Sequence, residues 1–404
     1  MANATERPCL LVLASTYPRW ENDNEPGFVH ELAKRLHGYF RVLVLCPHAH
    51  GAKHNEVIDG VEIIRYQYAP ARMQTLVSNG GIVNNLKQNR WKYLLLPSFF
   101  LMQIWHAWVI CQRERVDIVH AHWLMPQGLV AALLGFIAGR KIPFLVTSHG
   151  ADLFALKSNI FIAIKRFVLN RATKVTVVSH AMLNPMAALG ASGNKVSVLS
   201  MGVDMVSRFI PPKHMVRPQN QLLFVGRLVE KKGLRYLLDA LPFILRGNPE
   251  IRLSVVGFGP EEKFLKAKVQ SLGLERAVEF LGAFSQPELP SLYQRATLLV
   301  APFVEAKSGD QEGLGLVLVE AIGCACPVLA GNVAAVSELL EPEWQIDVRD
   351  PQLLAERILQ LLAAPATLNE QVLLLRERTF ARFDWTHVAV CYANQLYEIH
   401  RQKN

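Results

Sequence analysis

Two glutamates in the second half of the chain, Glu312 and Glu320, stand eight residues apart. Gly313 and Gly315 follow the first glutamate, and the apolar run 314–322 predicts a buried helix. A glycine-rich turn that opens a helix presents free backbone N–H groups and the positive end of the helix dipole. This turn therefore predicts an anion site.

The two carboxylates suit a particular kind of ligand. Glu312 is predicted to lie beside the anion, and Glu320 about two helical turns further along on nearly the same face. Carboxylates accept hydrogen bonds from hydroxyl groups, so the pair fits a ligand with hydroxyls at both ends of its phosphates, as in a nucleotide sugar. Asp310 and Glu312 also form a D-x-E pair, but no other ligand cluster accompanies them, so the sequence predicts no metal site.

The spacing of Glu312 and Glu320 resembles the E-x7-E signature of retaining glycosyltransferases with the GT-B fold, in the GT4-like family of bacterial polysaccharide and lipid-linked sugar transferases. A second segment, FVGRLVEKKG at 224–233, resembles the family's G-R-x-x-x-x-K-G element. The resemblance covers nearly the whole chain and is more specific in its second half. It implies an α/β protein with the GT-B fold, in which two Rossmann-like doubly wound parallel-sheet domains face each other across a cleft.

The alternation of elements along the chain supports two such domains independently. Short apolar runs bounded by turn residues predict buried parallel strands, with helical stretches between them. The predicted strands are 9–15, 41–47, 61–66, 116–122, 142–149, 174–180 and 195–202 in the first half, and 221–227, 251–259, 277–282, 297–303 and 326–331 in the second.

A proline-containing stretch without apolar periodicity, 206–220, separates the two series of strands and predicts a linker. The first domain is then predicted to span 1–205 and the second 221–384. The resemblance implies that the first binds the acceptor and the second binds the nucleotide-sugar donor. The sequence also predicts a last helix, and the resemblance implies that this helix, 385–404, crosses back onto the first domain.

The resemblance implies that Arg227 and Lys232 hold the donor pyrophosphate. A leaving nucleoside diphosphate gains negative charge as the sugar bond breaks, and two fixed cations can stabilise that charge without a metal. The resemblance also implies that Glu320 binds the ribose hydroxyls and that Glu312 lies near the sugar ring. The alternatives are a solvated surface turn for the EKKG motif and a core ion pair for Glu320.

The other predicted donor contacts are made by glycines, loop residues and backbone. The VVGFGP turn would lie near the nucleotide, although it also fits an ordinary tight turn and lacks the third glycine of a dinucleotide site. For Phe284, packing is an alternative to contact with the base, and the N–H groups of Leu316 and Val317 would cap the pyrophosphate. These donor positions are Gly226, Gly257, Gly259, Ala283, Phe284, Gly313, Leu314, Gly315, Leu316 and Val317.

Two positions of the first domain complete the predicted site. TSHGADLF at 147–154 resembles the family's H-G-x-D motif, which implies that His149 reaches the transferred sugar or its phosphate. A lone histidine is also commonly structural, and Asp152 would orient the loop or cap the next helix. Gly27 stands where the family has a glycine-rich loop that approaches the phosphate or acceptor, but this sequence has Pro26-Gly27 in place of Gly-Gly.

Composition bounds the class and the compartment. The chain has 404 residues, 51% hydrophobic and 19% charged, which predicts a packed globular protein of two or three domains. Its six cysteines show no paired metal-ligand spacing and favour a reduced, cytosolic compartment, and the first fifteen residues do not resemble a signal peptide.

The net charge of +9 lies entirely in residues 1–205, which hold 21 Lys and Arg against 12 Asp and Glu. This predicts an anionic partner for the first half, such as a phosphate, a phospholipid surface or nucleic acid. No aromatic-basic nucleic-acid module is present, so the sequence predicts no nucleic-acid partner.

The stretch 93–112 contains no charged residue and approaches the ~20 apolar residues that span a bilayer. Polar residues dilute it and a core strand follows directly, so the sequence favours a plain buried helix. The alternatives are a transmembrane span and a monotopic contact in which Trp91, Tyr93, Trp105 and Trp108 lie at the membrane interface.

The resemblance implies a retaining, metal-independent glycosyltransferase that needs no cofactor and takes a UDP-, GDP- or ADP-sugar as co-substrate. It would transfer the sugar to a glycan or lipid-linked acceptor in cell-surface polysaccharide or glycolipid biosynthesis. It would act in the cytoplasm, held peripherally at the cytosolic face of the inner membrane by its basic first domain. The predicted catalytic residues are His149, Arg227, Lys232 and Glu312.

Three alternatives remain open at this stage. A nucleotide-sugar epimerase of the same fold would act without an acceptor, and a non-catalytic protein would only bind the nucleotide sugar. An NAD-dependent enzyme with two Rossmann halves would need a complete G-x-G-x-x-G fingerprint with a downstream acid, which the sequence lacks.

Overall fold

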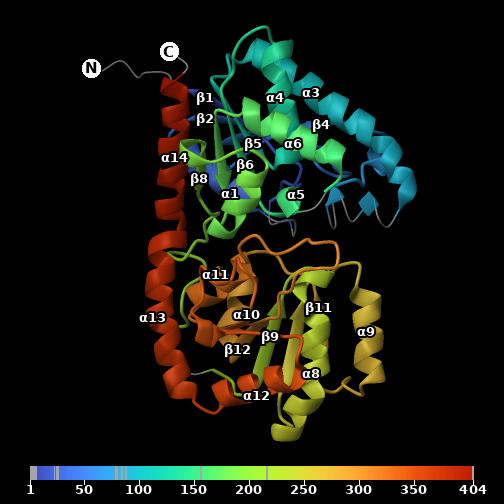
Figure 1. Cartoon of the computed structure of the whole chain (residues 1–404), viewed down its shortest axis with the longest axis vertical. Coiled ribbons are helices and arrows are strands. Elements are labelled where there is room, and N and C mark those ends of the chain that lie inside the picture. Colours follow the sequence, from blue (N-terminus) through green and yellow to red (C-terminus); the bar gives the residue numbers. More distant parts are fainter. Residues whose placement is uncertain are drawn as a thin grey trace. The chain divides into compact units, whose positions relative to one another are not determined.

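The computed structural model describes residues 7–21, 23, 27–77, 81–82, 85–86, 89–154, 157–214 and 217–402. The chain divides into two compact units (Figure 1). The first consists of residues 1–200 and 388–404, and the second of residues 201–387.

The first unit is built on a sheet with the strand order β3-β4-β2-β1-β5-β6-β7-β8. Its strands pair in parallel, except that β3 is antiparallel to β4. Strand β3 was not predicted, because its residues alternate between exposed and half-buried and lack an apolar run. The strands are β1 (Cys9–Leu13), β2 (Arg41–Pro47), β3 (Asn55–Ile58), β4 (Val61–Tyr66), β5 (Ile118–His122), β6 (Phe144–Ser148), β7 (Lys174–Val177) and β8 (Val196–Val198).

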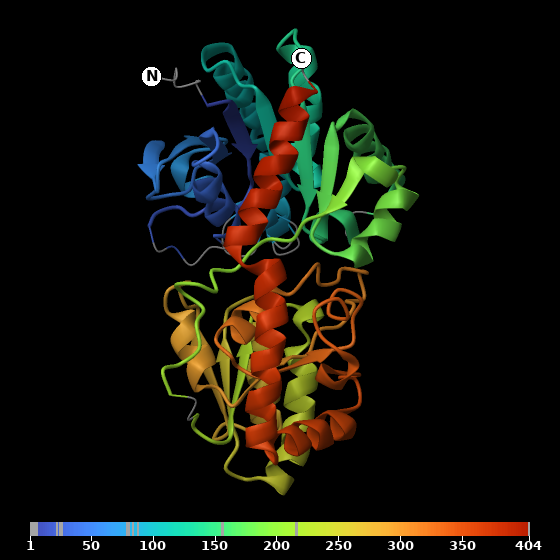
Figure 2. The ribbon, with the colours of Figure 1, turned by 90° about the vertical axis from the view of Figure 1, so that its left-hand side faces the viewer.

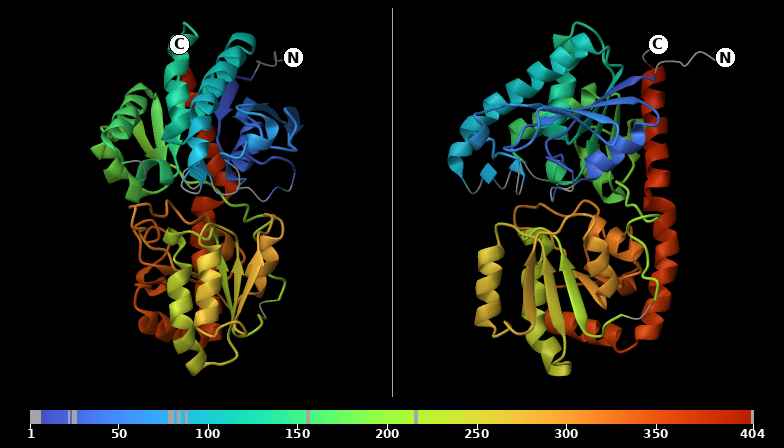
Figure 3. Two further views of the ribbon diagram at one scale, coloured as in Figure 1. Left: turned by 90° about the vertical axis from the view of Figure 1, so that its right-hand side faces the viewer. Right: turned by 180° about the vertical axis from the view of Figure 1, so that it is seen from behind.

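Helices cover both faces of this sheet. Helices α3, α4 and α6 lie beside one another on one face, and α14 lies on the other (Figures 1 and 3). The helical segments are α1 (Phe28–Leu36), η1 (Ala71–Met73), η2 (Arg90–Leu94), α3 (Leu95–Arg113), η3 (Leu124–Gly128), α4 (Leu129–Ile137), α5 (Ala151–Phe154), α6 (Asn159–Arg171), η4 (His180–Met182), α7 (Leu183–Ala188), η5 (Gly193–Lys195) and α14 (Trp385–Arg401).

The second unit has a parallel sheet in the order β11-β10-β9-β12-β13-β14, which is the order of a Rossmann fold. Its strands are β9 (Gln221–Val225), β10 (Arg252–Val256), β11 (Val278–Gly282), β12 (Leu298–Ala301), β13 (Val328–Gly331) and β14 (Gln345–Ile346). Its helical segments are η6 (Glu230–Lys232), α8 (Leu234–Gly247), α9 (Glu262–Ser271), α10 (Leu289–Arg295), α11 (Leu316–Gly323), η7 (Pro342–Trp344), α12 (Pro351–Leu362) and α13 (Pro365–Phe383).

The segment 206–220, which the sequence marks as a linker, belongs to the second unit. Phe209 is buried, and a side chain at Gly323 would come within 2.9 Å of the Phe209 carbonyl oxygen. Arg217 donates to carbonyl groups of the helix-to-strand turns, including those of Cys324 and Ala325. These contacts hold the segment against α11 and its neighbours.

Helix α14 begins in the second unit and belongs to the first from Val388 onward. The Tyr392 hydroxyl donates to the Leu199 carbonyl at 2.9 Å, and the Tyr397 hydroxyl donates to the Tyr39 carbonyl at 3.0 Å. Figure 2 shows α14 running along the strands of the first unit. Residues 388–402 therefore form part of the packing of that unit.

The prediction that 93–112 forms a plain buried helix is wrong in one respect. The helix exists as α3, but Leu101 and Trp105 are exposed while the polar Gln103 is fully buried. Within the described ranges, the segment Arg90–Arg113 is the one helix long and apolar enough to cross a membrane, and 33% of its most apolar window is buried. Strand β5 follows at Ile118 and pairs with β1 and β6, so α3 lies on the sheet as part of the folded unit.

Candidate active site

In the second unit, the loops that follow β9, β10 and β11 pack directly against one another. The Gly226 N–H donates to the Val256 carbonyl at 3.0 Å, and the Gly257 N–H donates to the Gly282 carbonyl at 2.7 Å. Gly257 has a φ of +129°, and a Cβ there would overlap the Gly226 carbonyl. A Cβ at Gly259 would likewise overlap the backbone of the β9 loop. The Gly-x-Gly turn therefore allows close backbone packing at the carboxyl edge of the sheet.

Lys232 lies at the end of η6, beside this edge. Its Nζ forms an ion pair with Glu312 at 2.8 Å and lies 4.4 Å from the centre of the Phe303 ring. The stem of Lys232 passes close to Gly226, and Gly315 faces the edge of the same phenyl ring. Five positions from two loops, 226–233 and 302–315, thus meet here. The sequence analysis did not predict Phe303. An apolar residue after a buried strand has no polar group that would mark it as part of a site.

The carboxylate of Glu312 is ionised. Burial acts to raise its pKa, but the charges of Lys232 and Lys231 outweigh burial and lower the pKa to about 2. Lys231 also holds the preceding loop, since its Nζ donates to the Gln311 carbonyl at 3.1 Å and to Asp310 at 3.2 Å. Glu312 is therefore a fixed acceptor of hydrogen bonds at neutral pH.

Helix α11 begins just after Gly315, which adopts a φ of +83°. Gly313 and Leu314 are buried, whereas Leu316 and Val317 are half-buried at the start of the helix. The Leu318 N–H donates to the Gly315 carbonyl at 2.9 Å. The first N–H groups of a helix otherwise lack an acceptor within it, so those of Leu316 and Val317 favour an anion. The start of α11, where the pyrophosphate is predicted to bind, thus follows four residues after Glu312, the partner of Lys232.

Glu320 is buried inside the same helix, and its partners are neutral. The Tyr293 hydroxyl donates to Glu320 Oε2 at 2.7 Å, and the Gln286 amide donates to Oε1 at 3.4 Å. Burial raises the pKa of Glu320 to about 7, although both hydrogen bonds act to lower it. No Lys or Arg of the described chain makes an ion pair with Glu320, so the core ion-pair alternative fails. Tyr293 and Gln286 were not predicted.

The remaining predicted donor residues lie at the ends of β9 and β11. Arg227 is half-buried two residues after β9, and its carbonyl accepts from the Val229 N–H at 2.9 Å. Ala283 is exposed and Phe284 half-buried in the loop after β11. The same loop also contains Gln286, whose amide donates to Glu320. The loop predicted to contact the base is therefore hydrogen-bonded to the residue predicted to bind the ribose.

In the first unit, His149 follows β6 and is paired with His122 at the end of β5. His122 Nδ1 and His149 Nε2 are 3.0 Å apart, and the two rings are stacked with centres separated by 5.2 Å. Phe28 and Trp123 each lie 5.0 Å from the His149 ring. Burial lowers the pKa of His149 to about 3, so its ring is neutral at physiological pH. His122 was not predicted as a site residue, although it ends the predicted strand 116–122.

Asp152 orients the loop that carries His149. Its carboxylate accepts from the Leu124 N–H at 2.7 Å, from the His149 N–H at 3.1 Å and from the Ser148 hydroxyl at 3.1 Å. Burial raises the pKa of Asp152, against the lowering effect of these hydrogen bonds. The loop-orienting role that the sequence indicated for this residue agrees with these contacts.

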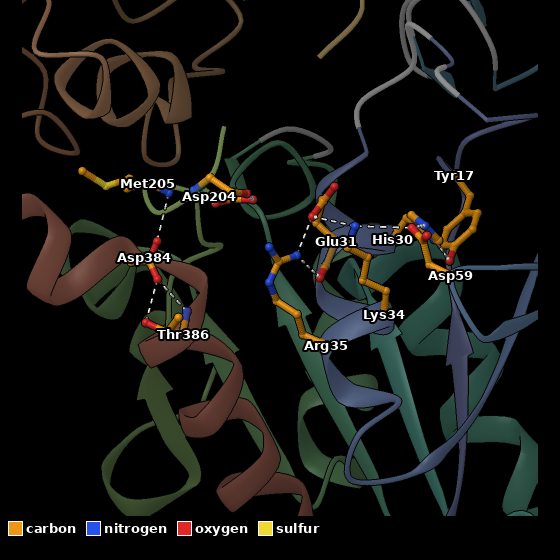
Figure 4. A network of polar contacts seen from close by, with 11 residues as sticks. Tyr17, His30, Glu31, Lys34, Arg35, Asp59, Asp204, Met205, Asp384 and Thr386 are labelled. Carbon is orange, nitrogen blue, oxygen red and sulfur yellow. Dashed lines mark hydrogen bonds and ion pairs between the residues drawn. The ribbon is translucent and has the colours of Figure 1, made fainter. Parts of the chain in front are cut away.

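Gly27, which the sequence predicts to approach the phosphate or acceptor, has an ordinary backbone conformation. Gly27 precedes α1 with a φ of −88°, and a Cβ there would meet only Pro18 at an ordinary 3.9 Å. Other residues can adopt this conformation, and Pro26 lies outside the described residues. One turn further along α1, His30 bridges the Tyr17 hydroxyl at 2.7 Å and Asp59 at 3.0 Å (Figure 4).

Figure 4 also shows a network that belongs to the second unit. The Asp384 carboxylate accepts from the Met205 N–H at 2.9 Å and from the Thr386 N–H at 2.8 Å. Asp384 thereby caps the start of α14 and ties it to the segment after residue 200. In the part of the chain that the structure describes, no group of three or more His, Cys, Asp or Glu is placed to hold a metal ion.

This chain has two Rossmann-like units, and one of them has a lysine–glutamate pair beside a helix N-terminus. This combination is that of the GT-B glycosyltransferases. Family comparison agrees with this class. Residues 28–202 match the glycosyl transferase 4-like domain, and residues 207–372 match the glycosyl transferases group 1 family. The chain therefore belongs to the GT4-like family of GT-B glycosyltransferases, and the predicted family and fold are confirmed.

Individual proteins show the same relationship. The chain is 28% identical over 249 residues to WcaL of Escherichia coli K12, named as a colanic acid biosynthesis glycosyltransferase; the match covers 60% of this chain and 61% of that relative. Sucrose-phosphate synthase from Thermosynechococcus elongatus superposes with a TM-score of 0.75 at 20% identity, covering 97% of this chain and 98% of the other. HepE from Anabaena, in complex with UDP-glucose, superposes with a TM-score of 0.73 at 19% identity, covering 96% and 99%.

Proposed function

We propose that the protein transfers a sugar from a nucleoside-diphosphate sugar to a glycan or lipid-linked acceptor in the biosynthesis of a cell-surface polysaccharide. The observation that carries the proposal is the ionised Glu312 paired with Lys232 beside the start of α11, with Glu320 in the same helix. This arrangement supplies positive charge for a diphosphate and acceptors for hydroxyls at both of its ends. WcaL is named for colanic acid biosynthesis and HepE binds UDP-glucose, which supports a nucleotide-sugar donor and a polysaccharide product.

In this proposal, the donor diphosphate is held by Arg227, Lys232 and the N–H groups of Leu316 and Val317. Charge on the diphosphate grows as its bond to the sugar breaks, so these fixed groups bind the transition state more tightly than the donor. They act without a metal ion. Glu320 accepts hydrogen bonds from the ribose hydroxyls.

We further propose that transfer retains the anomeric configuration by a front-face route. Glu312 accepts hydrogen bonds from the sugar, and the departing phosphate takes the proton of the acceptor hydroxyl. The neutral ring of His149, oriented by His122, contacts the transferred sugar or its phosphate. A trapped covalent glycosyl-enzyme intermediate would contradict this route.

The test begins with thermal unfolding of the purified chain in a panel of UDP-, GDP- and ADP-sugars. Binding raises the apparent stability by mass action, so the cognate donor gives the largest shift. Lys232→Ala and Glu320→Ala should each abolish the shift, and His149→Ala should keep the shift but lose turnover. Tyr392→Phe, which removes a buried hydroxyl outside this site, is the control.

Product analysis then decides between the candidate functions. With donor and an acceptor extract, NMR should show a new glycosidic bond with the anomeric configuration of the donor, formed equally in the presence of EDTA. An inverted product or loss of activity in EDTA would refute the retaining or metal-independent step. Conversion of the donor sugar without an acceptor would identify an epimerase, and a shift without turnover would identify a binding protein.

A further inference from the structure

The positive charge of the chain is concentrated in the segment that forms α3, α4 and α6. Residues 90–174 contain eleven Lys and Arg but three Asp and Glu, which accounts for eight of the nine net charges. Helices α3, α4 and α6 themselves contain no acidic residue. The helical layer on this face of the sheet therefore carries no negative charge within its helices, and its positive charge lies on α6 and at the helix ends.

The three acidic residues of the segment are engaged elsewhere. Glu114 forms an ion pair with Arg41 at 2.8 Å, Asp117 accepts from the Cys9 N–H at 2.9 Å, and Asp152 is buried in the His149 loop. In contrast, Arg113, Arg115 and Lys141 are exposed and form no ion pair with any residue of the described chain. Their charge is therefore available to an external anion.

The exposed side of this layer is also apolar. Leu94, Leu101 and Trp105 are 80%, 63% and 56% exposed, and their spacing of seven and four residues places them along one stripe of the α3 segment. Half-buried Trp108 continues the stripe, with its ring centre 5.1 Å from that of Trp105. An apolar stripe turned to solvent on a folded helix marks an interaction surface.

The carboxyl ends of α3 and α4 meet, where Arg140 donates to the carbonyls of Cys111 and Val116 at 3.2 and 3.0 Å. Phe136 and Ile137, at the end of α4, are 60% and 46% exposed there. The Arg171 guanidinium, at the end of α6, lies 3.8 Å from the centre of the Phe136 ring. Exposed apolar side chains are thus bordered by arginines and lysines.

We propose that this surface, formed by the α3 stripe and the ends of α4 and α6, docks the protein on an anionic phospholipid bilayer. The apolar side chains enter the boundary between headgroups and acyl chains, and Arg113, Arg115 and Lys141 contact the lipid phosphates. A second copy of the chain fits less well, because two such basic surfaces repel each other. The opposite side of α3 packs on the sheet, so the helix lies on the membrane without crossing it.

The basic end of the docking surface lies away from the predicted catalytic edge of the first unit, although the stripe itself begins at Leu94, at the other end of α3. The ends of α3, α4 and α6 precede strands β5, β6 and β7, whereas His122 and His149 stand at the opposite, carboxyl ends of β5 and β6. The proposal does not depend on glycosyl transfer, because it concerns a surface that contains none of the predicted donor residues.

The test is flotation of the full chain with vesicles of pure phosphatidylcholine or of phosphatidylcholine with 30% phosphatidylglycerol, without nucleotide or acceptor. The wild type should float with the anionic vesicles and be released by 0.5 M NaCl, because salt screens the contact with headgroups. Leu101→Ser/Trp105→Ser should lower the partition coefficient by about tenfold or more, since two apolar side chains that enter the bilayer are lost. Arg113→Gln/Arg115→Gln/Lys141→Gln should lower binding to anionic vesicles by a similar factor.

The matched control is Leu353→Ser/Leu374→Ser, which removes two exposed apolar side chains from the second unit and should leave flotation unchanged. Circular dichroism and thermal unfolding verify that each variant is folded. The proposal would be overturned if the wild type did not float, or if it floated equally with neutral and anionic vesicles. It would also be overturned if the test and control variants floated equally. A dimer of the wild type that Leu101→Ser/Trp105→Ser converts to a monomer, without flotation, would assign the surface to a second copy instead. Each of these results leaves the proposed donor chemistry unaffected.

Discussion

Tyr293→Phe isolates the buried hydrogen bond to Glu320 with little change in packing. The hydroxyl donates to Glu320 Oε2 at 2.7 Å, and it opposes the burial that raises the pKa of this carboxyl to about 7. A hydrogen bond to a charged group is worth about 1.5–3 kcal/mol, and one pKa unit corresponds to about 1.4 kcal/mol. The variant should therefore raise the pKa of Glu320 by about one to two units.

This shift has a consequence for donor binding that depends on pH. Near pH 7, the ionised fraction of Glu320 should fall from about one half to about one tenth or less. If the ionised carboxylate binds the ribose, the variant should bind the nucleotide about fivefold to fiftyfold more weakly at pH 7, for a shift of one to two pKa units. The deficit should disappear near pH 9.5, where Glu320 is ionised in both proteins.

Isothermal titration calorimetry with the nucleoside diphosphate of the cognate donor, from pH 6.5 to 9.5, measures this effect. The ratio of the two dissociation constants removes the titration of the nucleotide itself, which is common to both proteins. Glu320→Gln serves as the pH-independent reference, with weakened binding at every pH. A Tyr293→Phe ratio that stays constant across the pH range would refute the reasoning.

Three further predictions concern Glu320, the Lys232–Glu312 pair and His122. The folded pKa of Glu320 is raised from 4.5 to about 7, so its stabilising effect is complete below pH 4.5 and is lost as the pH rises through 7; Glu320→Gln should add ~3 kcal/mol to the unfolding free energy at pH 8 and little at pH 4.5. The folded pKa of Glu312 is lowered to about 2, so its stabilising effect is present above pH 4.5 and lost as the pH falls through 2. Lys232→Met should therefore cost ~3 kcal/mol in urea unfolding at pH 7, and adding Glu312→Gln should recover most of it, whereas equal destabilisation of both variants would contradict the ion pair. His122→Leu should lower kcat about tenfold with an unchanged Kd for the donor, and His122→Gln should restore part of kcat; a changed Kd would show that the pair does not act only by orienting His149.

The sequence predicted the fold because its central strands are continuous apolar runs. Strands such as 41–47 lie buried on both faces, and this pattern needs no tertiary information. The edge strands β3 and β14 were missed, since one alternates in exposure and the other has only two residues. The sequence could not show which side of α3 faces the sheet, because both sides are apolar.

The candidate site was predictable where chemistry and spacing coincide, as for Glu312 and Lys232, which the structure places 2.8 Å apart. Its neutral partners were not predictable. Tyr293 lies 27 residues from Glu320 and His122 lies 27 residues from His149, so only the pairing of strands and helices brings each pair together. The assigned roles of these residues in catalysis remain predictions.

The passage of α14 into the first unit has a consequence for biogenesis. Tyr392, Leu396 and Ile399 are buried in that unit, although they follow the whole of the second unit in the chain. During synthesis on the ribosome, the face of the first sheet that α14 covers stays exposed until residues 388–402 have emerged. The second unit can complete its own packing in the meantime, so the part of the protein made first is the part that matures last.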